Sequence, residues 1–143
     1  MQNYVNLLYR EEEREMLPLC RDEGIAVIPW SPMARGRLAR PWDSASARAE
    51  TDDFGRTLYA KTADADKRVV QAVAAVAQRH GVPMARVALA WVLQVPGITA
   101  PIVGATRLEQ LDEAVAALSL TLSPEDLAEL QAPYVPHAVV GHA

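Results

Sequence analysis

The chain has 143 residues, of which half are hydrophobic, and it carries a formal net charge of −4 and one cysteine. This length and composition are enough for one domain with a buried core, which excludes an intrinsically disordered chain. The acidic balance gives no electrostatic reason to expect nucleic acid as a partner, and one cysteine excludes an internal disulfide. No targeting segment and no apolar run long enough to span a bilayer is found, so we expect a cytoplasmic protein with no membrane partner.

The N-terminal part of the chain predicts two strands separated by a helix. Residues 1–9 supply enough apolar side chains for a strand. Residues 11–24 predict a helix that begins with solvated glutamates, which the helix dipole favours, and that Pro18 kinks. Residues 25–29 form a β-branched run, which is typical of a strand buried on both faces. Residues 39–66 form a long irregular loop, and loops of this length are usually functional lids or disordered segments.

The C-terminal part predicts four helices and one further strand. Valines at helical spacing indicate a helix over residues 67–80, and a second helix follows over residues 83–94 with a proline in its first turn. Residues 98–103 predict a third strand, after which a turn leads into a helix that ends at about residue 118. A short helix over residues 123–131 begins with a serine N-cap, a proline and two acids.

Strands that alternate with helices indicate a parallel α/β sheet with right-handed crossovers. Three parallel strands make a small sheet whose edges stay open, and open edges favour pairing with another chain. We therefore interpret residues 1–143 as one partial α/β domain with an irregular tail over residues 132–143. A homodimer that pairs the open sheet edges is one way to cover them.

Residues 25–38 contain the first candidate site. The strand ends at Trp30 and Ser31, and a loop with two arginines around Gly36 follows. Ligands bind at the carboxyl ends of parallel strands in α/β sheets and barrels. An aromatic ring and arginines at that position favour a floor for a flat ring beside a seat for phosphate. The alternative is a strand that ends in an ordinary loop, with Trp30 as a core residue.

Residues 102–113 contain the second candidate site. Gly104 permits close approach of the backbone to a ligand, and Thr106 with Glu109 three residues later predicts a capping box. Free amides at the start of the helix, together with Arg107, would make an anion site. Simple helix capping, which needs no ligand, explains the same pattern.

Other polar side chains add to these sites or limit their chemistry. Gln110 and Glu113 share one face of the predicted helix and could contact the same ligand. Gln2 lies in the first predicted strand, where its amide could meet a ring substituent or could simply be a polar residue near the N-terminus. Ser31 has no histidine nearby in sequence and no nucleophile-elbow glycines, which excludes a serine hydrolase. The tail histidines lack cysteine or paired acids, so no metal site is predicted.

Three segments of the chain match the pattern of a known family. IAVIPWSPMARGRL at residues 25–38 resembles the seventh-strand segment of aldo-keto reductases. GATRLEQLDE at residues 104–113 resembles their eighth-strand phosphate segment, and QNYVNLLYR at residues 2–10 resembles their sixth strand and its exit. The resemblance covers essentially the whole chain, from about strand six of a TIM (β/α)8 barrel onward. It implies an enzyme that binds NADPH and reduces small aldehydes or ketones.

The resemblance implies how individual residues would bind the nicotinamide end and the pyrophosphate of NADPH. Gln2 would form a hydrogen bond with the nicotinamide carboxamide, and Trp30 would stack on the nicotinamide ring. The pyrophosphate and its covering loop would be lined by Ser31, Pro32, Met33, Gly36 and Leu38.

At the other end of the cofactor, the resemblance implies that the adenosine 2′-phosphate contacts Gly104, Thr106 and Arg107. Gln110 and Glu113 would reach the adenine side. A site for the 2′-phosphate favours NADP(H) over NAD(H), which agrees with the anion site expected from the residues themselves.

The chain departs from the family pattern at several positions. The family usually has asparagine directly after the glutamate at position 113, where this chain has Ala114, and the tyrosine of the sixth-strand pattern is displaced to Tyr4. The catalytic aspartate, tyrosine, lysine and histidine of the family come from the first half of the barrel. Lys61 and Lys67 lie in or beside the long loop, so neither is assigned the role of the family's lysine. We therefore assign no catalytic residue and predict that the chain alone does not turn over. A non-catalytic nucleotide-binding or interaction module, similar to a regulatory subunit, and a truncated fragment without function stay open as alternatives.

Overall fold

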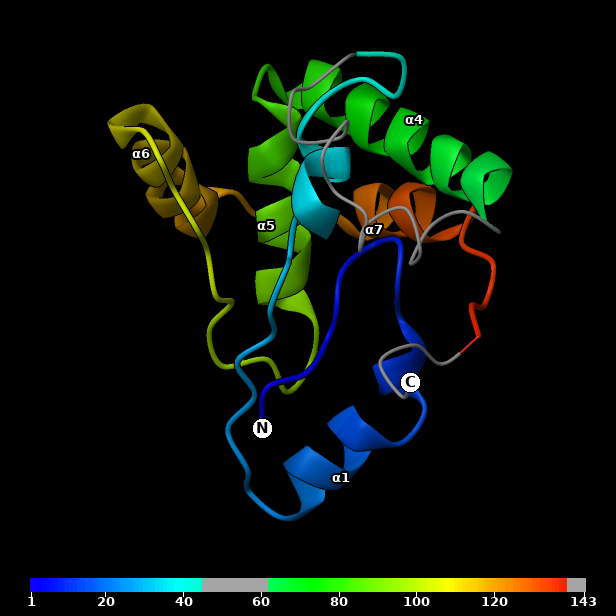
Figure 1. Ribbon diagram of the computed structural model, residues 1–143, viewed down its shortest axis with the longest axis vertical. Helices are drawn as coiled ribbons and strands as arrows, with labels where there is room; N and C mark the ends of the chain where they lie inside the picture. The colour runs from blue at the N-terminus through cyan, green and yellow to red at the C-terminus, as the bar shows by residue number, and fades with distance from the viewer. Residues whose placement is uncertain (45–61, 139–143) are drawn as a thin grey trace.

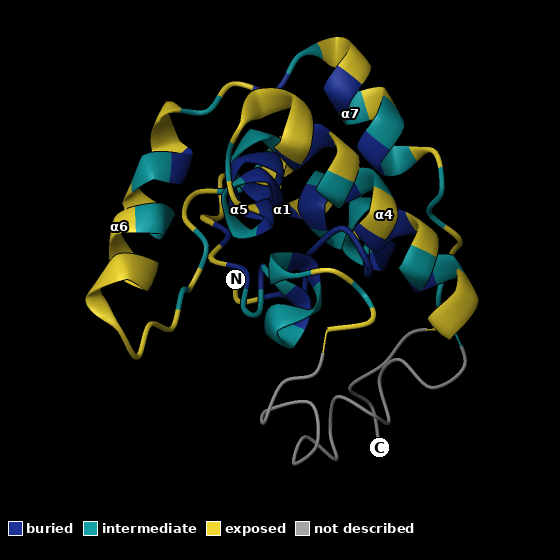
Figure 2. Ribbon diagram, turned by 90° about the horizontal axis from the view of Figure 1, so that it is seen from above, coloured by how far each residue is buried: buried dark blue, intermediate teal, exposed yellow. Residues whose placement is uncertain are grey.

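The computed structural model describes residues 1–44 and 62–138, in which helices predominate (Figure 1). Its helices, with 3-10 helices marked η, are in chain order η1 (Glu11–Glu13), α1 (Met16–Asp22), η2 (Ala34–Ala39), α4 (Ala63–His80), α5 (Met84–Gln94), α6 (Leu108–Ala116), η3 (Ala117–Ser119) and α7 (Pro124–Gln131). α5 lies at the centre, with α6 on one side and α4 and α7 on the other (Figures 1 and 2).

Three extended segments lie side by side in the places of the three predicted strands. Parallel bridges join Tyr4 to Trp30 and Val27 to Ile98. The backbone N–H of Thr99 donates to the carbonyl oxygen of Val27 at 2.8 Å, which supports the second pairing. The segments therefore run parallel, and the second lies between the other two.

None of these segments forms a continuous strand within the described residues, so the prediction of three strands was wrong for this chain. One reason is Pro29, which cannot donate to a ladder of backbone hydrogen bonds. The prediction that residues 25–29 are buried on both faces was also wrong. Val27 and Pro29 are buried, whereas Ile25 and Ile28 are 42% and 41% exposed. Only one face of this segment packs on other described parts of the chain.

The predicted helix over residues 11–24 is divided into η1 and α1, which are separated by two residues. Pro18 lies in the first turn of α1, where its missing N–H costs no helical hydrogen bond. The predicted kink therefore takes the form of a break before the proline. Leu17 and Cys20 on α1 are buried and pack with Val27 in a small second core.

The remaining helices lie close to their predicted positions. α4 begins about one turn earlier than predicted, and Gly81 ends it with a φ of +64°, which glycine adopts without strain. Pro83 is the N-cap of α5 rather than its first residue. α7 begins with a capping box, in which the hydroxyl oxygen of Ser123 accepts from the N–H of Asp126 at 3.1 Å and Asp126 Oδ2 accepts from the N–H of Ser123 at 3.0 Å.

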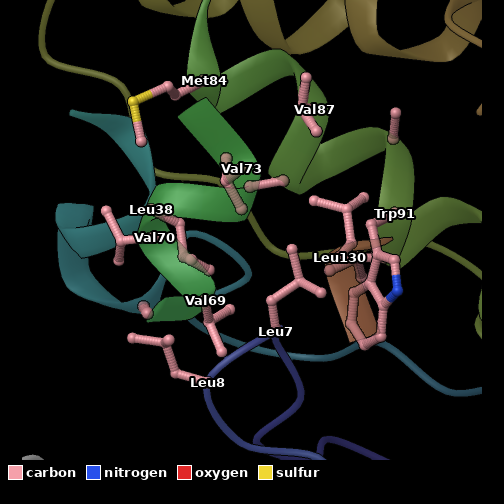
Figure 3. Packing of buried hydrophobic residues seen from close by; sticks show 14 of the residues in the cluster. Leu7, Leu8, Leu38, Val69, Val70, Val73, Met84, Val87, Trp91 and Leu130 are labelled. Atoms are coloured by element: carbon pink, nitrogen blue, oxygen red, sulfur yellow. The ribbon is translucent and has the colours of Figure 1, made fainter. Parts of the chain in front are cut away.

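The main core lies between α4, α5 and α7 and is completed by the N-terminal segment and η2. Leu7, Val73, Trp91 and Leu130 are each at most 1% exposed and belong to this core (Figure 3). Burial of a large apolar side chain contributes about 1.5–3 kcal/mol. This cluster therefore supplies most of the packing energy that holds the helices together.

α6 presents an apolar face to solvent. Leu108, Leu111 and Val115 of α6 and Leu118 of the adjoining η3 recur at helical spacing and are 50–71% exposed, and we call them the α6 stripe. Figure 2 colours most of α6 as exposed. α6 itself has no buried residue. An apolar stripe of this kind normally faces a core. Within the described part of the chain, nothing covers it.

Two predicted irregular segments lie partly outside the described residues. Of the predicted loop 39–66, residues 45–61 lie outside them, and of the tail 132–143, residues 139–143 do. The described part of the tail, residues 132–138, contains neither helix nor strand, as predicted. In the ranges that are described, no helix has the length and apolar character needed to cross a membrane.

Candidate functional site

The two candidate sites follow neighbouring parallel segments. The N–H of Ile102 donates to the carbonyl oxygen of Pro29 at 2.8 Å, which places the ends of the two segments side by side. Trp30 follows Pro29 directly, and Gly104 comes two residues after Ile102. Because the segments run parallel (upward in Figure 1), the two candidate loops begin at the same end of the array.

The loop after Trp30 is held in a left-handed backbone conformation that non-glycine residues rarely adopt. The φ angles are +54° at Ser31, +48° at Ala34, +57° at Arg35 and +92° at Gly36. Ser31 stabilises the loop, because its hydroxyl accepts from the N–H of Arg35 at 3.1 Å and its carbonyl accepts from the N–H of Ala34 at 2.9 Å and from the side chain of Asn6 at 3.1 Å. Such conformations cluster at ligand sites, where successive N–H groups can form a concave anion seat.

Trp30 belongs to a stack of three aromatic rings. Its ring lies on that of Tyr4, with centroids 4.2 Å apart and planes 20° apart, and Tyr4 in turn stacks on Tyr9 at 4.8 Å. Trp30 is half-buried. One face of the indole is therefore covered by Tyr4, so that a flat ligand ring can stack only on the opposite face. This stack was not predicted from the sequence.

The other residues expected to line the pyrophosphate differ in exposure. Pro32 is buried, Met33 and Gly36 are half-buried, and Leu38 is fully buried in the main core. The side chain of Leu38 therefore cannot contact a ligand, and its N–H already donates to the carbonyl oxygen of Met33 at 3.3 Å. Arg40, which the sequence analysis did not single out, donates to the carbonyl oxygen of Gly36 at 3.2 Å. A Cβ at Gly36 would lie 2.8 Å from the Arg40 guanidinium, so this glycine allows the arginine to cover the loop.

The second loop is exposed, and its predicted capping box does not form. The N-cap of α6 is Arg107 rather than Thr106, and its side chain makes no capping bond. Gln110, three residues after the N-cap, accepts from the N–H of Thr106 at 2.9 Å and from its hydroxyl at 3.2 Å. The prediction of a Thr106–Glu109 box was wrong because the helix starts one residue later. Gly104, like these polar side chains, is exposed, and nothing lies within 4 Å of a Cβ built on it.

The two residues at the edges of the expected site have different surroundings. Gln2 is exposed. Glu113 is half-buried and forms a two-bond ion pair with Arg86 of α5, with Nη2–Oε2 and Nε–Oε2 distances of 2.7 and 2.9 Å. The carboxylate expected to face the adenine is thus already paired, and it ties α6 to α5.

Glu11 is buried, which overturns the expectation that it is a solvated helix-start residue. Its Oε1 accepts from the Tyr134 hydroxyl at 2.6 Å and from the N–H of His137 at 2.9 Å, and Arg14 lies 3.1 Å from Oε2. Burial raises the pKa of Glu11, but these hydrogen bonds and Arg14 outweigh it and leave the pKa below its ordinary value. This group fastens the tail to η1.

The described residues contain no arrangement that indicates a metal site. Over residues 1–44 and 62–138, no group of three or more histidine, cysteine, aspartate or glutamate side chains is arranged to hold a metal ion. The groups that remain at the ends of the parallel segments are a half-buried indole, a strained loop and an exposed loop with threonine and arginine.

The family model of the Aldo/keto reductase family matches residues 1–134. The chain belongs to this family. It is similar to the versiconal hemiacetal acetate reductase of Aspergillus parasiticus, with 48% identity over 141 residues, which are 97% of this chain and 41% of that protein. It is also similar to an aldo-keto reductase of Fusarium vanettenii, with 41% identity over 145 residues, 100% of this chain and 38% of that protein.

A solved structure of an aldo-keto reductase supports the fold. A thermostable aldo-keto reductase in complex with the inhibitor epalrestat matches 92% of this chain and 38% of its own, with a TM-score of 0.64 and 24% identity. The chain thus spans about two fifths of the length of the aldo-keto reductases it matches.

Proposed function

We propose that the chain forms the cofactor-holding part of an NADPH-dependent aldo-keto reductase that reduces small aldehydes or ketones. The proposal is carried by one observation, that the strained loop 31–36 and the exposed loop 104–107 begin at the same end of neighbouring parallel segments. A dinucleotide has a flat ring at each end and phosphates between, which are the groups that such loops bind.

For the nicotinamide end, Trp30 would stack on the ring with the face that Tyr4 leaves uncovered. Gln2, which is exposed, would meet the carboxamide of the nicotinamide. The pyrophosphate would lie on the left-handed loop from Ser31 through Met33 to Gly36. The N–H groups of Ala34, Arg35 and Gly36 donate within this loop, so they would keep its shape, and the N–H groups of Ser31 and Met33 would face the phosphates. Pro32 and Leu38, whose side chains are buried, would contribute by fixing the shape of the loop, because proline has no N–H and the N–H of Leu38 donates to the carbonyl oxygen of Met33.

For the adenosine end, Gly104 leaves open space for close approach, and Thr106 and Arg107 are exposed beside it. A guanidinium matches the geometry of a phosphate with two parallel hydrogen bonds. We therefore propose that Arg107 holds the 2′-phosphate and gives the preference for NADP(H) over NAD(H). Gln110 would face the adenine, and Glu113 would act mainly by holding α6 through its ion pair with Arg86.

When bound, NADPH supplies a hydride to the carbonyl carbon, and the carbonyl oxygen then needs a proton from a positioned acid. We propose that this acid is not in the chain. The hydroxyl of the half-buried Tyr134 donates to Glu11 and fastens the tail, so we assign it no part in the reaction. The remaining part of the barrel would supply the acid from an upstream segment or from a separate polypeptide.

A second candidate function is a non-catalytic module that binds nucleotide or another protein. The α6 stripe favours it, because exposed leucine and valine side chains at 50–71% exposure indicate a contact surface. The same stripe would be covered by the rest of the barrel in a complete reductase or by a second copy in a homodimer.

The test is a titration of the purified chain with NADPH and NADH, followed by nicotinamide fluorescence. We expect saturable binding of NADPH, weaker binding of NADH, and a roughly tenfold loss of NADPH affinity in Arg107→Gln. Arg68→Gln removes the same charge from the exposed side of α4 and should leave the affinity unchanged. Equal affinity for both cofactors, or an unaffected Arg107→Gln variant, would contradict the assignment of the 2′-phosphate site.

Catalysis is tested separately with NADPH and an aromatic aldehyde. The chain alone should not oxidise NADPH above the rate without protein. Measurable turnover that follows the amount of the chain would contradict the proposal that the acid is missing.

A further inference from the structure

A cavity of about 370 Å³ lies between α1, the end of α5 and α7. Small-molecule sites usually measure about 300–1,000 Å³, so this cavity has room for a small ligand. None of the residues that line it belongs to the candidate cofactor loops, to the α6 stripe or to the exposed isoleucines of the parallel segments. It is built by this chain alone and is separate from the proposed function.

The charged groups of the cavity leave one cation uncompensated. Arg10 is neutralised by Glu13, which accepts from it at 2.8 and 2.7 Å, and its guanidinium lies 5.5 Å from the centre of the Trp91 ring. Arg21, which also lines the cavity, has no acidic partner within 4 Å among the described residues. Its stem packs on Gly97, because a Cβ there would lie 2.9 Å from Arg21 Cγ. The cavity therefore carries a net positive charge.

Hydrogen-bond donors also remain without partners. Trp91 lines the cavity, and within the described part of the chain its buried indole Nε1 has no acceptor. A buried N–H without a partner costs about 1–3 kcal/mol, so this residue of the cavity wall carries an unsatisfied donor. Gln131 uses its Oε1 to accept from Arg10 at 3.2 Å, which leaves its NH2 group to donate. These hydrogen-bond donors and the guanidinium of Arg21 together favour an anionic ligand.

The walls of the cavity are apolar, so a ligand must be apolar in its body as well as negatively charged. They are formed by Leu17, Pro18, Val95, Pro96 and Leu127. We infer that the cavity binds a small carboxylic acid with an apolar, ring-sized body, whose carboxylate pairs with Arg21 and whose body contacts these walls. A free inorganic anion would lack the apolar contacts, and a neutral molecule would lack the ion pair.

The indole N–H of Trp91 offers a direct probe in two-dimensional ¹H–¹⁵N NMR of the full chain. The chain has three tryptophans, and a Trp91→Phe variant assigns the Trp91 signal by its disappearance. Sodium benzoate is the probe ligand, and benzamide is its neutral counterpart. We expect benzoate to shift the Trp91 signal with saturation at or below about 10 mM, and benzamide to shift it little.

Arg21→Gln should weaken benzoate binding about tenfold, because it removes a charge-assisted hydrogen bond to the carboxylate. Arg21 is exposed, and glutamine keeps the part of the stem that packs on Gly97. Arg68→Gln, on α4, should bind benzoate like the unmodified chain. Far-UV circular dichroism checks that both variants are folded. The inference is overturned if benzoate leaves the Trp91 signal unmoved, if benzamide shifts it equally, or if Arg21→Gln binds benzoate as tightly as Arg68→Gln.

Discussion

α6 and α7 are short amphipathic helices of nine and eight residues, and they meet the central helices in opposite ways. α7 buries Leu130 completely in the main core and begins with a capping box. α6 has no buried residue, no side-chain cap and an exposed apolar stripe, and it is tied to α5 by the Arg86–Glu113 ion pair. An apolar stripe in a sequence thus predicts which face of a helix is buried in a contact. It does not predict whether the same chain or another chain makes that contact.

The largest expected difference between the two helices concerns one matched substitution. Leu130→Ala should lower the free energy of unfolding by about 2–5 kcal/mol, because it leaves a cavity in the core. Leu111→Ala on α6 is the same substitution at a half-exposed site, and it should alter the free energy of unfolding by less than about 0.5 kcal/mol. Chemical denaturation measures both.

A large loss of unfolding free energy in Leu111→Ala would show that the α6 stripe is already covered in solution, most simply by a second copy of the chain. In that case the loss should depend on protein concentration, because dissociation and unfolding would be coupled. A loss that is independent of concentration would contradict the description of α6 as a helix without a partner.

The next effect concerns the acid sensitivity of α7. Burial raises the pKa of Asp126, but the hydrogen bonds from Arg79, from the N–H of Ser123 and from His80 outweigh it and hold the pKa well below its usual range. A group with a lowered pKa in the folded state stabilises the fold above its unfolded pKa, and this stability is lost as the pH falls. We expect the free energy of unfolding to fall below about pH 4.

Asp126→Asn should remove part of this pH dependence and cost about 1–3 kcal/mol at neutral pH. Glu129→Gln is the matched control, since Glu129 also accepts from Arg79 at 2.7 Å but is more exposed, and it should cost less than about 1 kcal/mol. Denaturation curves at several pH values measure both. An unchanged pH profile in Asp126→Asn would contradict the assignment.

A smaller effect compares the starts of the two helices. Ser123→Ala should cost about 1 kcal/mol, because it removes the hydroxyl that caps α7. Thr106→Ala, at the start of α6, should change stability by less than about 0.5 kcal/mol, yet weaken NADPH binding if this loop holds the cofactor. Denaturation and fluorescence titration of the same two variants separate the two roles.

The smallest expected effect on stability comes from a charge placed in the α6 stripe. Val115→Glu should leave the free energy of unfolding nearly unchanged, because Val115 is 58% exposed. If two copies of the chain pair through this stripe, the variant should shift the sedimentation coefficient from that of a dimer to that of a monomer. If the dimer persists in Val115→Glu, the two copies associate through another surface.

Much of the fold followed from periodicity in the sequence. α4, α5 and α7 lie close to their predicted ranges because their apolar positions face a core that this chain itself provides. The strands were overpredicted, since a strand is stabilised by neighbours on both sides and on both faces. Ile28 is 41% exposed where the sequence suggests burial, because no described part of the chain covers it.

The candidate site was predictable only in part. The sequence located both loops and their common end, because parallel strands place their carboxyl ends together. It placed the N-cap of α6 at Thr106 rather than Arg107, since a one-residue shift leaves the pattern of residue types almost unchanged. It missed that Leu38 is fully buried and that Glu11 binds the tail, because both depend on contacts between residues distant in sequence.

The central claim is that one cofactor contacts both loops. ¹H–¹⁵N NMR of the chain during a titration with NADPH tests it directly, through the backbone signals of residues 31–36 and 104–107. We expect both sets to move together with a single affinity, and NADH to move the second set less. If only one loop responds, or if the shifts occur instead around Trp91, the two loops do not share a dinucleotide site and the central claim is wrong.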